Sequence, residues 1–256
     1  MSDVEERAQE WVKAPVDKKD IPTPVLPYES KLVAYIDILG VKDKVENSGD
    51  DAAQIVDIMN QIRTYVDSEC SELKKEDLLN SLQIGDGFFI MVDFKYVNEI
   101  CEILAAVQCQ ILINSHMLLR GALTAGKVAI GDDEEYFIGP AIIDAITLEN
   151  QNAIFPRIVF NSMEIEKYVK KRDIKYKYIA EDQDKIKYLD YIKYYIESDK
   201  FKIENPEDFL KKNGVDKFLR EAYVKHLNSK KREAKREAQK YGWLIYKFDI
   251  NGIKMV

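Results

Sequence analysis

Residues 32–43 have the sequence LVAYIDILGVKD, in which a carboxylate interrupts an apolar run. The apolar residues before Asp37 predict a buried strand over about 31–37. The apolar run then resumes at Ile38 and stops at Gly40. A charge inside a core strand is costly unless a partner offsets it. Asp37 is therefore either a strand-end residue that caps a turn, or a residue placed there to bind something.

The segments that follow predict a regular order of helices and strands. Apolar residues recur every three or four positions over 50–66 and again over 97–111, which predicts two amphipathic helices. Between them, NSLQIGDGFFIMVDF (80–94) predicts two strands joined by a hairpin at Gly85-Asp86-Gly87, where glycine supplies a positive φ. MLLRGALTAGKVAIG (117–131) predicts a further strand. The order strand, helix, strand, strand, helix, strand is the split βαβ pattern of a ferredoxin-like or palm domain.

The flanking regions predict additions to this core. Residues 1–30 are polar and rich in proline near their end, which predicts an extended N-terminal arm. PAIIDAITLENQNA (140–153) predicts a helix with proline in its first turn, and PRIVF a strand, so the core domain extends over 31–180. Residues 181–256 predict a helical C-terminal extension ending in a strand at WLIYKFDI. The basic run before that strand, NSKKREAKREAQK, predicts a solvated helix face, with contact to a triphosphate or a dimer partner as the alternative.

Composition excludes several classes of function. The net charge of −7 over 256 residues argues against a nucleic-acid binder, because neutralising phosphates requires a basic surface. Three cysteines predict small core residues rather than a disulfide framework, and two histidines make a zinc site or a histidine-based triad a poor fit. The charged N-terminus and the absence of an apolar run of spanning length predict a soluble, cytoplasmic chain with no membrane partner.

A second carboxylate, Asp86, suggests that Asp37 is part of a metal-binding pair. In a palm topology the first strand lies beside the hairpin, so Asp37 and Asp86 are expected to converge. Two neighbouring carboxylates repel each other, and hard divalent cations between them make the arrangement favourable. Two magnesium or manganese ions held in this way can activate a hydroxyl group and bind the phosphates of a nucleoside triphosphate. Taken alone, Asp86 can instead be a hairpin residue chosen for its φ preference.

Several motifs together resemble a known family. YIDILG, IGDG, LRGALTAGKVAIG and YFIGPAIIDAITLE are similar to segments of class III nucleotidyl cyclases. The closer resemblance is to the bacterial pyrimidine cyclases of Pycsar antiphage systems, which share a DILG strand, an LRG strand and a GPA…A…LE helix followed by PRI. The resemblance covers roughly residues 31–160. It implies an α+β fold with a ferredoxin-like/palm βαββαβ cyclase core and a mainly helical C-terminal extension.

The resemblance also implies roles for individual residues. Asp37 and Asp86 would be metal ligands, with the carbonyl of Ile38 as a third contact. The backbone amides of the turn would face the β- and γ-phosphates, because a strand-to-helix turn presents unpaired N–H groups to anions. These amides belong to Ile38, Leu39, Gly40 and Val41.

Two positions depart from the purine-reading pattern of the family. Asn80 and Tyr136 stand where purine cyclases have a lysine and an aspartate. An amide can hydrogen-bond a pyrimidine edge, and a tyrosine can stack on the base or bond to it. The ordinary interpretation is a turn residue for Asn80 and a strand aromatic for Tyr136.

The transition-state residues of the family are missing. Ile143 and Thr147 stand where many class III enzymes carry an asparagine and an arginine. Another cation must then offset the charge on the leaving pyrophosphate, since this chemistry depends on positioning and electrostatics. The candidates are Arg120, which can alternatively pin the sheet by an ion pair, Lys127, which is otherwise a solvated strand residue, and Arg157. If none of these reaches the phosphates, the chain is a degenerate cyclase that binds without turnover.

The activity that the resemblance implies is cyclisation of UTP, or of CTP, to a 3′,5′-cyclic nucleotide and pyrophosphate with two divalent cations. It also implies a head-to-tail homodimer with sites at the interface, and a second-messenger role in antiphage defence with a separate cyclic-nucleotide-activated effector. Two alternatives remain open at this point. One is a palm nucleotidyltransferase that joins separate nucleotides into oligonucleotide signals, and the other is a silent nucleotide-binding or scaffold protein.

Overall fold

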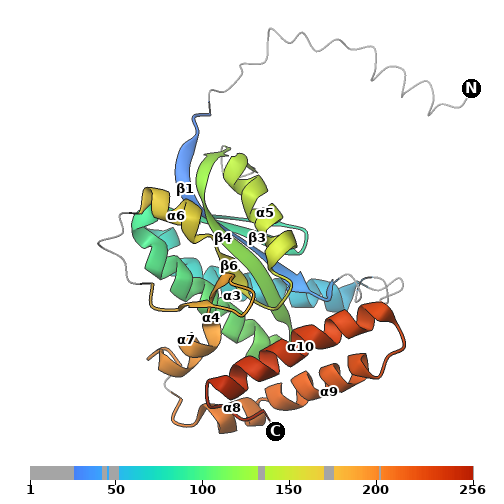
Figure 1. Cartoon of the computed structure of the whole chain (residues 1–256). Coiled ribbons are helices and arrows are strands. Elements are labelled where there is room, and N and C mark those ends of the chain that lie inside the picture. Colours follow the sequence, from blue (N-terminus) through green and yellow to red (C-terminus); the bar gives the residue numbers. More distant parts are fainter. Residues whose placement is uncertain are drawn as a thin grey trace, which may run out of the picture.

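The structure is a computed structural model that describes residues 26–41, 45, 52–131, 136–169, 176–201 and 203–255 (Figure 1). It has a mixed sheet with helices on both faces, so the predicted α+β class is confirmed. Most of the predicted arm, residues 1–25, lies outside the described residues. Residues 26–28 have no regular structure, and the first strand begins at Glu29, inside the range expected for the arm.

The central strands follow the predicted order. The strands are β1 (Glu29–Leu39), β2 (Leu79–Ile84), β3 (Gly87–Val92), β4 (Leu118–Ile130), β5 (Phe137–Ile138), β6 (Ile158–Phe160), β7 (Ile179–Glu181) and β8 (Lys187–Leu189). Along the sheet they lie in the order β2-β3-β1-β4-β6-β8-β7, with β5 paired to β4. β1 runs antiparallel to both β3 and β4, which with β2 is the ferredoxin-like arrangement expected from the sequence.

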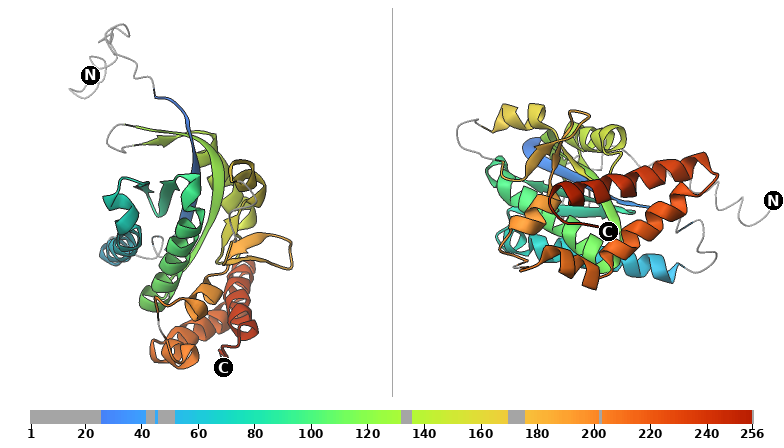
Figure 2. Two further views of the ribbon diagram at one scale, coloured as in Figure 1. Left: turned by 90° about the vertical axis from the view of Figure 1, so that its left-hand side faces the viewer. Right: turned by 60° about the horizontal axis from the view of Figure 1, so that its bottom comes forward.

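Helices cover the two faces of the sheet unequally (Figure 2). α3 (Ala53–Lys75) and α4 (Val97–Ser115), the latter preceded by the 3-10 turn η1 (Phe94–Tyr96), cover one face, and α5 (Pro140–Asn152) covers the other. Alternation along β1 sends Ile36 to the core under α3 and α4, and Tyr35 to the core under α5. By the same alternation Asp37 points to the α5 side.

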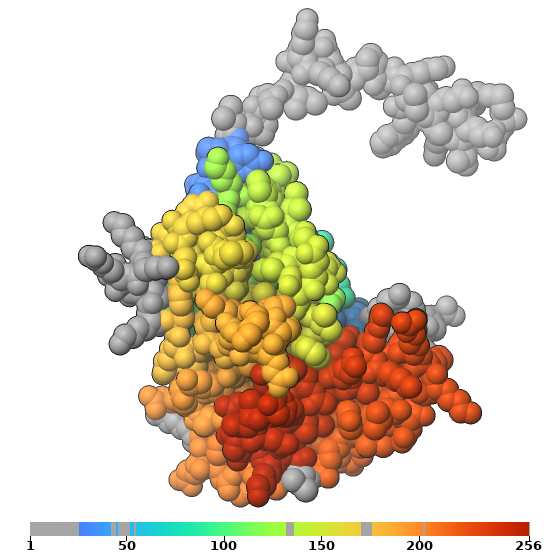
Figure 3. Space-filling model, in the orientation of Figure 1, coloured from blue at the N-terminus to red at the C-terminus, as the bar shows by residue number. Residues whose placement is uncertain are grey.

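The second half of the chain is mainly helical. Its helices are α6 (Ser162–Tyr168), α7 (Tyr191–Glu197), α8 (Pro206–Lys212), α9 (Val215–Leu227) and α10 (Arg232–Ile250). α9 and α10 pack together at one end of the sheet, where they form the lower part of the molecule in Figures 1 and 3. The sheet continues beyond residue 180, because β8 pairs with β6, so the predicted boundary at 180 cuts through the β7–β8 hairpin.

The predicted C-terminal strand is wrong. WLIYKFDI belongs to α10. The buried apolar residues of this helix, Ala234, Ala238, Leu244 and Phe248, recur at helical spacing, whereas a strand would bury every second residue. Aromatic and β-branched residues suggested a strand, and packing of a helical face against the rest of the protein decided the outcome.

One helix contradicts the expectation that the chain has no apolar run of spanning length. Phe94–Ser115 is long and apolar enough to cross a membrane, with a mean hydropathy of 1.3 over an 18-residue window. However, 67% of that window is buried inside the protein, as in the core helix of a globular domain. Two of the three cysteines, Cys101 and Cys109, lie in this helix and are buried and free, as is Cys70, which confirms the prediction of small core residues.

Candidate functional site

Asp37 and Asp86 line the same pocket, as the sequence predicted. β1 and β3 pair in register through Ile36 and Phe88, so the residue after Ile36 lies beside the turn that joins β2 to β3. That turn holds Asp86. The pocket has a volume of about 310 Å³ and is lined by Asp37, Ile38, Leu39, Gly40, Asp86, Arg120, Glu237 and Lys240.

The hairpin glycines have two different purposes. Gly85 adopts a φ of +61°, the positive value expected of a tight turn. Gly87 has no positive φ; instead, the ring of Tyr35 lies 2.5 Å from where a Cβ would stand. Only glycine at this position lets the hairpin approach β1 so closely. This contact keeps Asp86 next to the strand that carries Asp37.

The turn after β1 presents backbone to the pocket. The side chains of Ile38 and Val41 are buried, Gly40 has a φ of +86°, and Val41 is helical. The predicted strand-to-helix turn is therefore present between Leu39 and Val41.

Arg120 bonds Asp37. The two residues face each other in the register of β4 and β1, and Nε and Nη2 of Arg120 both donate to Oδ2 of Asp37, at 3.1 Å and 3.0 Å. Arg120 therefore forms an ion pair between two strands of the sheet, which is the alternative role predicted for it. Its guanidinium is thus bonded to a carboxylate of the pocket that it lines.

Glu149 is a functional candidate that the sequence analysis missed. This α5 residue is 1% exposed, and its Oε1 lies 2.6 Å from Nε of Arg120. Among the described residues Oε1 accepts no hydrogen bond, since the Nε–H points to Asp37. The available signal was spacing, because Ala141, Ala145 and Glu149 recur every four residues on the buried face of the helix.

The electrostatics of the site show an excess of negative charge. Burial raises the pKa of Asp37 above its ordinary value, hydrogen bonds from Arg120 offset this in part, and the charge of Asp86 adds to it. Burial raises the pKa of Glu149 to about 7, against the attraction of Arg120. Burial and the neighbouring carboxylates also raise the pKa of Tyr35 to about 12.

The donor set fits hard divalent cations. Carboxylate and carbonyl oxygens are the ligands such ions prefer, and Asp37, Asp86 and the carbonyl of Ile38 offer them on one pocket. Within the described ranges, no group of three His, Cys, Asp or Glu side chains is placed to hold a metal. Most coordination positions would therefore be filled by water or by oxygens of a bound phosphate.

α10 contributes two charged residues that the sequence analysis did not assign to the site. Lys240 and Glu237 line the pocket with the aspartates, and Nζ of Lys240 lies 2.6 Å from Oε1 of Glu237. Lys240 is the last residue of the basic run, and this end of the run lines a pocket.

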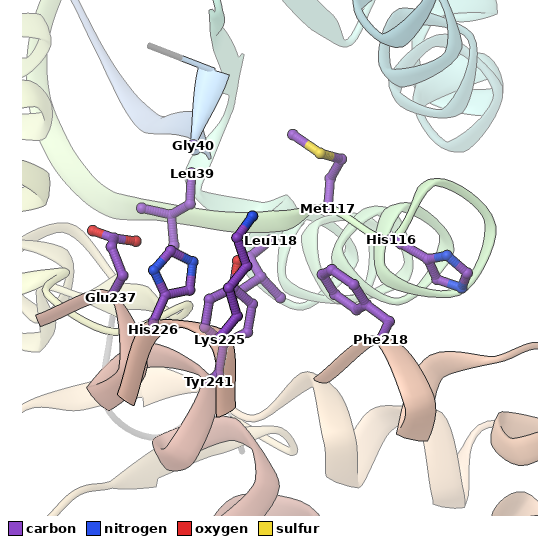
Figure 4. Close-up of a pocket in the computed structure, with 10 residues that line it drawn as sticks. All are labelled: Leu39, Gly40, His116, Met117, Leu118, Phe218, Lys225, His226, Glu237 and Tyr241. Atoms are coloured by element: carbon purple, nitrogen blue, oxygen red, sulfur yellow. The ribbon is translucent and has the colours of Figure 1, made fainter. Parts of the chain in front are cut away.

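A second pocket also borders the turn. It has a volume of about 520 Å³, and Leu39, Gly40 and Glu237 line both pockets. Figure 4 shows its remaining walls, which come from the end of α4, the start of β4, α9 and α10, and include His226 and Tyr241. The helical extension thus borders the β1 turn in both pockets.

Three of the predicted substrate-binding residues lie far from the aspartates within one chain. Asn80 is the second residue of β2 while Asp86 follows the end of that strand, and Lys127 pairs with Ser30, near the start of β1. At about 3.3 Å per strand residue, these separations are on the order of 20 Å. Tyr136 packs over Gly131 beyond the end of β4, and its side chain is 37% exposed.

Arg157 requires a correction. Its side chain is fully buried, and it bonds Asp182 at 2.8 Å, Asp184 at 2.5 Å and the carbonyl of Asn152 at 3.0 Å. Trp243 of α10 donates to the same Asp182 at 2.7 Å. The structure therefore gives Arg157 a structural role, joining β6, the β7–β8 hairpin and α10, in place of the predicted catalytic one.

Comparison with known proteins finds similarity at the level of structure. No protein-family profile and no curated protein matches this sequence. The monomeric guanylyl cyclase domain of the RhoGC fusion protein from the fungus Blastocladiella emersonii matches 63% of this chain and 95% of its own, with 17% identity and a TM-score of 0.47. The guanylate cyclase domain of RhGC from Catenaria anguillulae in complex with GTP matches 63% of this chain and 93% of its own, with 17% identity and a TM-score of 0.45.

A bacterial light-regulated adenylyl cyclase is also similar, at 14% identity and a TM-score of 0.47. The match covers 65% of this chain and 52% of that protein, so this chain spans about half of its length. At these TM-scores and identities the likeness carries no conclusion about activity.

Proposed function

We propose that this protein is a nucleotidyl cyclase that converts a pyrimidine nucleoside triphosphate, UTP before CTP, into its 3′,5′-cyclic monophosphate and pyrophosphate. The observation that carries the proposal is the shared pocket of Asp37 and Asp86, whose wall includes the end of β1, at Ile38 and Leu39, and the turn at Gly40. Carboxylates and a turn with exposed backbone in one pocket suit a metal-bound triphosphate. The preference for a pyrimidine, and for UTP, rests on the sequence resemblance.

The residues have separate tasks in the proposed reaction. Asp37, Asp86 and the Ile38 carbonyl would hold Mg²⁺ or Mn²⁺, which when bound lowers the pKa of the ribose 3′-hydroxyl and neutralises phosphate charge. The turn amides of Leu39, Gly40 and Val41 orient the β- and γ-phosphates. The 3′-oxygen then forms a bond to the α-phosphorus, the bond from that phosphorus to the bridging oxygen breaks, pyrophosphate leaves, and the hydroxyl proton passes to solvent.

A head-to-tail homodimer is part of the proposal. Asn80 and Tyr136 lie at the end of the sheet away from Asp37, so they can read the base only in a site that a second copy completes. Two exposed apolar side chains near this end are available for such pairing: Ile138 is 54% exposed, and Ile143 on α5 is 66% exposed. Apolar side chains gathered on a surface mark sites of association. The role in antiphage signalling, with a separate effector, rests on the sequence resemblance.

A second candidate function is nucleotide binding without turnover. The observation that favours it is the pair of hydrogen bonds from Arg120 to Asp37, because an internal cation already satisfies one of the two carboxylates. In a degenerate cyclase such a pair would replace a metal ion.

Incubation of the purified protein with each of the four nucleoside triphosphates and Mn²⁺, followed by mass spectrometry of the products, separates these functions. Cyclic UMP or cyclic CMP with pyrophosphate is the expected result. A linear or cyclic oligonucleotide would indicate a nucleotidyltransferase. Cyclic AMP would overturn the pyrimidine preference, and binding of a nucleotide with no product would favour the silent protein.

A further inference from the structure

The proposed reaction leaves a charge problem in the pocket. The leaving pyrophosphate gains negative charge, and this must be offset by a cation other than those on the aspartates. Ile143 and Thr147 cannot supply one, and Arg157 is buried elsewhere against Asp182 and Asp184. Arg120 lines the pocket, but it donates to Asp37 and lies against Glu149.

Lys240 is the other described basic residue that lines this pocket. Its side chain is only 17% exposed, so its ammonium group is screened less than one on the open surface. In the structure it bonds Glu237, one turn earlier on α10, at 2.6 Å. A bound phosphate would replace the carboxylate of Glu237 as the anion beside Lys240, so the ammonium group would keep a charge-assisted contact.

The helix that carries Lys240 is anchored to the core. Trp243 and Lys247 both donate to Asp182, at 2.7 Å and 3.0 Å, and the ring of Trp243 stacks on Phe155 with centroids 5.5 Å apart. These contacts lie within two turns of Lys240 on the same helix. The lysine thus projects into the pocket from a fixed element, and its four-carbon stem supplies the reach.

We propose that Lys240 binds the β- and γ-phosphates of the substrate and neutralises the leaving pyrophosphate, so that the C-terminal extension completes the triphosphate site within the same chain. Glu237 holds the lysine when no phosphate is bound. This inference rests on the proposed function for its catalytic part, whereas the polyphosphate site itself can exist without turnover.

The test compares Lys240→Met and Lys240→Arg with Lys235→Met, which removes an exposed lysine from the same helix. Binding of inorganic tripolyphosphate in the presence of Mn²⁺ is measured by calorimetry on the full chain. Lys240→Met should weaken binding about 10-fold or more, because a charge-assisted contact is lost, whereas Lys240→Arg should stay within about 3-fold. Lys235→Met should bind as the unchanged protein does.

Turnover adds a second measurement. Lys240→Met should lower kcat more than it raises KM for the nucleotide, and inhibition by added pyrophosphate should weaken. Glu237→Gln provides an independent variant, which should bind tripolyphosphate several-fold more tightly because a competing carboxylate is removed. If Lys240→Met does not fold, the tripolyphosphate affinity of Glu237→Gln tests the role of Lys240 instead, and an unchanged affinity would overturn it.

The outcomes distinguish this inference from the proposed function. If the unchanged protein forms no cyclic product but Lys240→Met still loses tripolyphosphate affinity, the cyclase function fails and the Lys240 site stands. If cyclic product forms and Lys240→Met keeps both its kcat and its affinity, the role of Lys240 is overturned. Failure of the unchanged protein to bind tripolyphosphate overturns it as well.

Discussion

Arg120 donates two hydrogen bonds to a single oxygen of Asp37, from Nε at 3.1 Å and from Nη2 at 3.0 Å. Glu149 lies against the same guanidinium, and Asp86 lines the same pocket as Asp37. The single positive charge of Arg120 is therefore set against three neighbouring carboxylates. Binding of a divalent cation would relieve the remaining repulsion, and it would do so in competition with Arg120 for Asp37.

Replacing Arg120 should reveal this competition. Arg120→Ala should lower the free energy of unfolding by about 1–3 kcal/mol without metal, because partly buried carboxylates lose their partner. Added Mn²⁺ should then raise the melting temperature of Arg120→Ala more than that of the unchanged protein, with Arg120→Lys between them. Equal Mn²⁺ shifts in all three proteins would count against a cation site at Asp37 and Asp86.

The carboxylate pair itself should be required for turnover but not for folding. Asp37→Asn and Asp86→Asn should each reduce formation of cyclic nucleotide at least about 100-fold, since each removes a charge that holds a cation. Thermal unfolding should change little for Asp86→Asn, because the loss of one carboxylate relieves repulsion in the pair. Asp199→Asn, at an exposed aspartate after α7, is the matched control. Full activity in either pocket variant would remove the two-metal mechanism.

Mixing inactive variants tests the head-to-tail dimer. In a shared site, Asp37→Asn and Tyr136→Ala carry their defects in different halves, so an equimolar mixture should regain about a quarter of the original activity through heterodimers. The mixture of Asp37→Asn with Asp86→Asn should stay inactive, because both defects lie in the same half. If neither mixture exceeds the sum of its components, the site is completed within one chain.

Glu149 should make stability depend on pH. Its pKa is raised from 4.5 to about 7, so the folded state holds a proton that the unfolded chain releases, and its contribution to stability is lost as pH rises from 4.5 through 7. Glu149→Gln should therefore be more stable than the unchanged protein at pH 8, by on the order of 1 kcal/mol, and should lose this advantage at pH 5. Urea unfolding at both values measures this, with the exposed Glu72→Gln as control. An advantage of equal size at both pH values would contradict the assignment.

Asp182 should give the stability of the protein a pH dependence of the opposite sign to that of Glu149. Burial acts to raise its pKa, but hydrogen bonds from Trp243, the Gln183 N–H and Lys247 outweigh it, and its pKa is lowered. Its stabilising effect is then present above the ordinary aspartate range and is lost as pH falls through the lowered value. Asp182→Asn should cost about 3 kcal/mol at pH 7, because Arg157 and Lys247 keep buried charges, and less in acid. A cost independent of pH would contradict this.

Local patterns of apolar residues were sufficient to predict the elements of the core. The spacing of apolar residues predicted β1, α3, the β2–β3 hairpin, α4 and β4, because periods of two and of 3.6 residues report directly which face of an element is buried. The convergence of Asp37 and Asp86 followed from that order, since a palm topology has few ways to arrange its strands.

Side-chain partners were not predictable in the same way. Arg157 looked like a free cation near the motifs, and only the folded chain brings Asp182 and Asp184 around it. Glu149 looked like an ordinary helix residue, although α5 places it beside Arg120. Such pairs join residues far apart in sequence, and no local period encodes them.

The C-terminal region separates what the sequence determines from what tertiary packing decides. By itself the sequence determined a βαββαβ core, an aspartate pair and a glycine turn, because each depends on neighbours within a few residues or on strand order. Only the tertiary structure decided that residues 243–250 continue a helix and that this helix brings Lys240 to the pocket of Asp37. The physical reason is that packing of α10 on Asp182 and α9 is a long-range contact, and its energy outweighs the local preference of aromatic and β-branched residues for strands.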